Sequence, residues 1–157
     1  MSSRPRSILA VALVGAVAAV PLAAGSAAAT PVRHEAAQVA SVQRYVTDAT
    51  SATSALADFG NDLRSLDSLG EFKSKLPELR RELRSFDASI RRLRVYRLQS
   101  KVIEGQRSRL ARTGPPLAVT LNKFLNAVRD NDASEVRDLL PKVNADLQRF
   151  AKAAQVG

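Results

Sequence analysis

The 157-residue chain contains no cysteine, which excludes disulfides, covalently attached haem and a lipid anchor linked through cysteine. Its fold must therefore be held by packing. Histidine and methionine occur once each, as His34 and Met1. Since Met1 lies in a segment that we expect to be removed, a haem could be ligated only through His34 or Tyr96. We predict that the chain carries no haem.

Metal-binding patterns are incomplete as well. None of the six glutamates precedes a histidine at the Glu-x-x-His spacing that di-iron sites use in helical bundles. The run Asp130-Asn131-Asp132 begins like a calcium loop, but Glu135 stands where that loop needs glycine and Pro141 where it needs glutamate. We interpret this run as a turn and helix cap, and we predict no metal and no cofactor.

Catalytic patterns are equally scarce. All seven glycines are isolated, so the chain has no glycine-rich phosphate loop, and no nucleophile motif surrounds His34. Glu78 and Glu82 share one helical face among several arginines, a setting typical of surface ion pairs and not of paired catalytic carboxylates. We therefore predict that the protein is not an enzyme.

The first 29 residues have the pattern of an export signal. Arg4 and Arg6 precede an uncharged run over 7–24, and small residues follow up to an expected cleavage site after Ala29. A retained membrane anchor is the alternative, but it needs about 20 strongly apolar residues, and this run is shorter, rich in alanine and interrupted by glycine and proline. We expect a secreted or extracytoplasmic protein with no transmembrane helix in its mature form, residues 30–157. Abundant alanine and the preference for arginine over lysine are typical of GC-rich, actinobacterial genomes.

The mature chain shows helical periodicity and no strand-like alternation, since apolar residues recur at spacings of three and four. We predict one all-α domain, an antiparallel bundle of four helices of which the first two are long and the others shorter. The expected helices cover residues 34–66, 71–104, 116–130 and 133–154.

The clearest stripe lies in the second of these segments, where seven apolar residues repeat at four-three spacing: Phe72, Leu76, Leu79, Leu83, Phe86, Ile90 and Leu93. This spacing favours a coiled-coil-like pairing with the first helix. Beyond Leu93 the stripe moves to Val95, Leu98 and Val102, which suggests a change of partner. The sequence Gly114-Pro115-Pro116 is expected to end the helix, and Pro141 to kink or split the last one.

Positive charge concentrates in the second predicted helix. The chain has a net charge of +9, and no acidic residue occurs between Ala88 and Ile103. The basic residues of this interval are Arg91, Arg92, Arg94, Arg97 and Lys101. They are candidates for binding an anionic cell-envelope polymer or an acidic protein. A specific nucleic-acid site is not expected, because the interval offers few aromatic side chains for stacking on bases.

A second candidate surface is apolar. If the shorter helices leave part of the first hairpin uncovered, its tip would expose Phe59, Leu63, Leu66, Leu69, Phe72 and Leu76. Such a patch could bind a partner protein, serve as an inhibitor module or form a homo-oligomer. The commoner fate of apolar residues near a turn is to pack on one another, and we favour that outcome.

Together these patterns favour an exported, non-enzymatic binding protein that uses the basic residues. Protein binding or self-association through the hairpin tip is the alternative.

Overall fold

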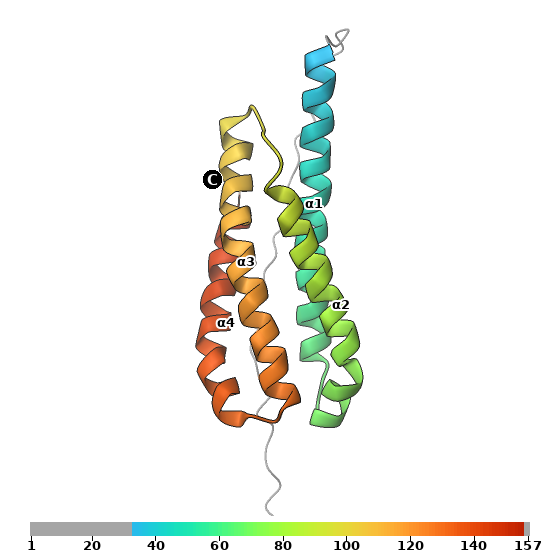
Figure 1. Cartoon of the computed structure of the whole chain (residues 1–157), viewed down its shortest axis with the longest axis vertical. Coiled ribbons are helices and arrows are strands. Elements are labelled where there is room, and N and C mark those ends of the chain that lie inside the picture. The colour runs from blue at the N-terminus through green and yellow to red at the C-terminus, as the bar shows by residue number, and fades with distance from the viewer. Residues whose placement is uncertain (1–32, 156–157) are drawn as a thin grey trace, which may run out of the picture.

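The computed structural model describes residues 33–155, which form four helices and no strand (Figure 1). These are α1 (Arg33–Arg64), α2 (Leu69–Leu93), α3 (Lys101–Arg129) and α4 (Ala133–Ala154). The prediction of an all-α helical bundle is confirmed. The expected signal peptide, residues 1–29, lies outside the described range. Within that range, no helix combines the length and the hydropathy that crossing a membrane requires.

Neighbouring helices in the sequence are also neighbours in space, with α1 against α2, α2 against α3 and α3 against α4. In Figure 1 the chain reverses direction at each connection, and the first turns of α1 extend beyond the end of α2. Residues 94–100 connect α2 to α3 and form the longest of the three connections. We call this segment the linker, and the end of the bundle at which it lies the linker end.

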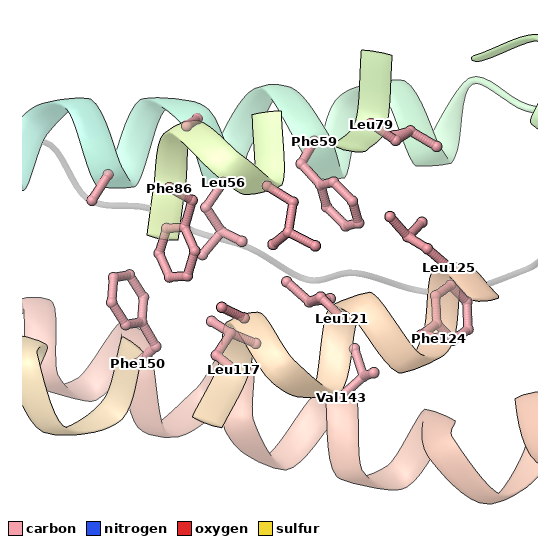
Figure 2. Close-up of a cluster of buried hydrophobic side chains, with 14 of the residues drawn as sticks. Leu56, Phe59, Leu79, Phe86, Leu117, Leu121, Phe124, Leu125, Val143 and Phe150 are labelled. Atoms are coloured by element: carbon pink, nitrogen blue, oxygen red, sulfur yellow. The ribbon is translucent and has the colours of Figure 1, made fainter. Parts of the chain in front are cut away.

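All seven residues of the four-three stripe in α2 are buried, as the spacing predicts. They pack with α1, α3 and α4 in one apolar core, part of which Figure 2 shows. Within it the rings of Phe86 and Phe150 meet edge to face, with centroids 5.2 Å apart and planes at 76°. This arrangement is the one that aromatic quadrupoles favour. It ties α2 to α4, which are not sequence neighbours.

The second helix ends at Leu93, so the prediction that it continues to residue 104 is wrong. The chain leaves the helix over residues 94–100 and starts α3 at Lys101, with Ser100 as its N-cap. Of the three residues to which the stripe was expected to move, Leu98 is buried, while Val95 and Val102 are largely exposed. The apparent shift of the stripe therefore marks the loss of helix and not a change of partner.

The prediction that Gly114-Pro115-Pro116 ends a helix is also wrong, because all three residues lie inside α3. Gly114 has no Cβ to clash with the following proline ring, which removes part of the usual restriction on this position. It is buried and packs directly on Ile90 of α2. As a result α3 has 29 residues against 25 in α2, so the long helices are α1 and α3.

The last helix, α4, agrees more closely with the prediction from the sequence. The Asp132 side chain accepts a hydrogen bond of 2.9 Å from the Glu135 amide, which confirms the predicted cap. Pro141 does not split α4, which is continuous from Ala133 to Ala154.

The apolar residues proposed for the hairpin tip lie mainly inside the core. Phe59, Leu63, Leu66, Phe72 and Leu76 are each at most 8% exposed, and Leu69 is half-buried. They cover one another where α1 turns into α2, as the favoured interpretation expects. The folded monomer thus presents no extended apolar surface there.

Candidate functional site

The five basic residues of the acid-free interval all lie at the linker end, but not on one helix. Arg91 and Arg92 occupy the last turn of α2, Arg94 follows that helix, Arg97 lies in the linker and Lys101 begins α3. All five side chains are exposed. The expectation of a positive face along the second helix therefore needs correction: its charges are spread over a helix end, a connection and a helix start.

These five cations differ in how far neighbouring acids neutralise them. Arg91 pairs with Asp87 at 2.8 Å, and Arg92 pairs with Asp48 of α1 at 2.6 Å. Arg94, Arg97 and Lys101 form no ion pair with any carboxylate of residues 37–155, whose side chains the structure describes. Arg97 donates instead to the carbonyl oxygens of Arg94 and Tyr96, at 3.3 and 3.0 Å. Three positive charges therefore remain available to an incoming anion.

A buried polar contact fixes the linker to both of the helices it joins. Arg107 of α3 is 7% exposed, and its Nη1 donates to the carbonyl oxygen of Leu93 at 2.8 Å. Its Nε donates to Glu104 Oε2 at 2.8 Å, and the same oxygen accepts from the Leu98 amide at 3.1 Å. Arg107 also lowers the pKa of Glu104 to about 2, assisted by the hydrogen bond from the Leu98 amide. Arg107 thus satisfies the last carbonyl of α2, while Glu104 holds the middle of the linker.

A second contact fixes the linker to α1. The carboxylate of Asp48, which is 8% exposed, accepts hydrogen bonds from Arg92 of α2 and from the hydroxyl of Tyr96 in the linker. Burial is the largest cause that raises the pKa of Tyr96, and the hydrogen bond to Asp48 adds to it. Since Asp48 is neutralised within the protein, it does not oppose the positive charge of the linker end.

A third contact joins the remaining helices near the same place. The Tyr45 hydroxyl of α1 donates to Gln106 Oε1 of α3 at 2.9 Å, and Gln106 Nε2 donates to the carbonyl oxygen of Ala154 at 2.7 Å. Burial raises the pKa of Tyr45 to about 12. All four helices and the linker are therefore connected at this end by polar contacts that are buried or partly buried.

A groove of about 600 Å³ lies between α1 and the linker. Its lining residues are Val39, Ala40, Gln43, Arg44, Thr47, Asp48 and Tyr96. Val39 is 64% exposed, and Arg44 is exposed without an ion pair to a described carboxylate. The groove therefore combines an accessible apolar side chain with an unneutralised cation.

Away from the linker end, three carboxylates gather between α1 and α2. Single oxygens of Asp62, Glu78 and Glu82 all lie within 4.8 Å of one another. Glu78 is held by Lys75 at 2.8 Å and by Arg81 at 3.1 Å, in line with the predicted surface ion pairing. For Glu82 the same prediction is wrong, since it forms no ion pair with a described residue. Glu82 Oε2 is buried and accepts no hydrogen bond from residues 33–155. Burial, followed by repulsion from Asp62, raises the pKa of Glu82 to about 7.

Sequence reasoning identified the cations but missed the residues that hold them in place. Tyr45 and Asp48 are three residues apart and therefore share one face of α1, where both are buried, a pattern that could have suggested buried hydrogen bonds. Ser100 as an N-cap residue and the acidic Glu104 in the first turn after it could have suggested the beginning of α3. The groove had no such signal, because α1 and the linker are distant in the sequence.

No family model, curated protein or solved structure matches this chain.

Proposed function

We propose that this protein is exported and acts without catalysis, by binding an anionic partner at the linker end of its helical bundle. The observation that carries the proposal is the set of three exposed cations, Arg94, Arg97 and Lys101, that have no ion pair within residues 37–155. A cell-envelope polymer and an acidic protein both provide the complementary charge.

The setting of these cations supports a binding role more than a merely solvated surface. A linker tied to Leu93, Glu104 and Asp48 holds its charges at defined positions, so less conformational freedom is lost when an anion binds. Export is supported by the N-terminal sequence pattern described above. The apolar alternative at the hairpin tip receives no comparable support, because those side chains are largely used by the core.

The direct test is a triple charge reversal, Arg94→Glu, Arg97→Glu and Lys101→Glu. Binding to fluorescent poly-aspartate should weaken roughly tenfold or more at low salt, because the substitutions replace three positive charges by negative ones where the anion binds. Binding by the unmodified protein should itself weaken as salt is added, because salt screens exposed charges. Fluorescence anisotropy titrations at several salt concentrations measure both effects.

A matched control is available at the opposite end of the bundle. Lys73→Glu, Lys123→Glu and Arg137→Glu change the net charge equally, and these three side chains are exposed and make no ion pair within residues 37–155. Circular dichroism melts establish that both triple variants fold. Equal loss of binding in the two variants would show that net charge alone matters and would contradict a site at the linker end.

A further inference from the structure

We propose that the groove between α1 and the linker receives an apolar side chain of an acidic peptide segment, so that the natural partner is an acidic protein. This inference rests on the proposed function and specifies its partner. It predicts a contact that a polymer carrying anionic groups alone could not make.

The first argument is the distribution of exposed apolar side chains. Four large hydrophobic residues of the described chain are strongly exposed, and three of them lie in or beside the linker or the groove: Val39, Val95 and Val102, at 64%, 76% and 57%. The fourth, Val119, is in the second half of α3, far along that helix from the linker. Of these valines Val39 lines the groove and Val95 adjoins the lining residue Tyr96 in the chain, so an exposed apolar side chain lies where a partner could contact it.

The second argument is charge complementarity. Arg44 lines the groove, and Arg97 neighbours the lining residue Tyr96 in the chain. The carboxylate of Asp48 in the lining is already engaged by Arg92 and Tyr96. The charge left to the groove is therefore positive, and a segment with carboxylates on either side of an apolar residue would satisfy both the cations and Val39.

The third argument is the size of the groove and its position. The groove is shallow and open to solvent, and its volume of about 600 Å³ leaves room for one side chain to lie against its wall. Six of its seven lining residues belong to α1, whose first turns extend beyond the end of α2 (Figure 1). A peptide backbone could therefore follow α1 while one of its side chains enters the groove.

The test uses two fluorescent peptides with the same number of glutamates, one with leucines between them and one with serines. The unmodified protein should bind the leucine peptide roughly tenfold more tightly, the effect expected from burying part of an apolar side chain. Val39→Ser should abolish most of this preference and leave binding of the serine peptide unchanged. Val119→Ser, an equally exposed valine away from the groove, is the matched control and should keep the preference.

The outcomes separate this inference from the proposed function. If both peptides bind with equal affinity, or if the leucine preference survives Val39→Ser, the groove does not receive the apolar side chain and the inference is wrong. Salt-sensitive binding that the linker-end charge reversal abolishes would still support the proposed function in that case. If neither peptide nor poly-aspartate binds, the proposed function itself fails. Since Val39 is exposed, its replacement should not disturb folding, and a circular dichroism melt verifies this.

Discussion

Gly114 shows how one residue can determine the distance between two helices. A Cβ atom built on Gly114 would lie 2.6 Å from Ile90 Cγ2 and 2.8 Å from Ile90 Cδ1 and Cγ1. Such separations are far below van der Waals contact, and Ile90 is fully buried. Hence α2 and α3 can approach this closely only because position 114 is glycine.

We predict that Gly114→Ala lowers the free energy of unfolding by about 1–3 kcal/mol, the usual cost of forcing an extra methyl group into a packed core. Helix propensity alone would predict a gain of up to about 1 kcal/mol. Urea unfolding followed by circular dichroism measures the difference. The substitution should cost much less in an Ile90→Ala background, where the clashing atoms are absent.

Gly105 offers the matched control within the same helix. A Cβ there would meet only the end of the Arg109 side chain, at 3.7 Å. Gly105→Ala should therefore stabilise the protein slightly, as propensity predicts. Equal stabilisation by both alanine substitutions would contradict the close approach at Gly114.

At the scale of elements, the sequence predicted burial more accurately than boundaries. Four-three spacing identified every buried apolar residue of α2, though not the buried Ser89, because the helical period fixes which side chains share a face. Helix ends depend on individual contacts instead. The end of α2 depends on Arg107, which lies in the next helix and reaches back to Leu93. The sequence pattern also predicted wrongly that Pro115 and Pro116 end a helix. The close packing of Gly114 on Ile90 of α2 supports α3 at this point, and a contact between two helices is not visible in a local sequence pattern.

Only part of the candidate site could likewise be predicted from the sequence. The basic residues could be predicted because an acid-free interval is visible in one stretch of sequence. The groove could not, since it brings Val39 of α1 next to Tyr96 of the linker. Nor did the sequence indicate that Asp48 of α1 would neutralise Arg92, a pair that joins residues 44 positions apart.

The linker itself depends on Arg107, and its replacement gives a prediction for this element. Arg107→Met keeps much of the side-chain volume but removes the hydrogen bonds to Leu93 and Glu104. We expect a loss of about 1–3 kcal/mol in stability, because buried hydrogen-bonding groups lose their partner. Amide hydrogen exchange at Leu98 should become faster, since Glu104 no longer has a fixed position from which to accept that hydrogen bond.

The neighbouring exposed arginine provides the control. Arg109→Met should leave exchange at Leu98 and the urea midpoint close to those of the unmodified protein. If Leu98 exchanges equally slowly in Arg107→Met, the linker is held by other contacts, and Arg107 does not position the cations.

For the whole molecule, the shifted pKa values of Glu82 and Glu104 predict that the free energy of unfolding is largest in mildly acidic solution. The folded-state pKa of Glu82 is about 7, above its ordinary value of 4.5, so its contribution is fully present below pH 4.5 and is lost as the pH rises through 7. Glu104 acts in the opposite sense. Its folded-state pKa is about 2, so its contribution is present above pH 4.5 and is lost as the pH falls toward 2.

Glu82→Gln tests the first half of this prediction. Glutamine cannot ionise beside Asp62, Glu78 and Asp58, so the decline in stability between about pH 4.5 and pH 7 should become shallower. Urea midpoints across this range measure the slope. Glu135→Gln, on the exposed first turn of α4, is the control and should keep the slope of the unmodified protein. A slope unchanged by Glu82→Gln would show that Glu82 does not retain its proton in the folded state.

The positions of the aromatic residues give the molecule a built-in optical reporter. The chain has no tryptophan and two tyrosines. Tyr45 and Tyr96 both lie at the linker end, with their hydroxyls bonded to Gln106 and Asp48. All five phenylalanines are buried in the core, and they absorb and emit at shorter wavelengths than tyrosine. Tyrosine emission therefore observes one end of the bundle alone, so an unlabelled ligand that reaches the groove can be followed there while far-ultraviolet dichroism records all four helices.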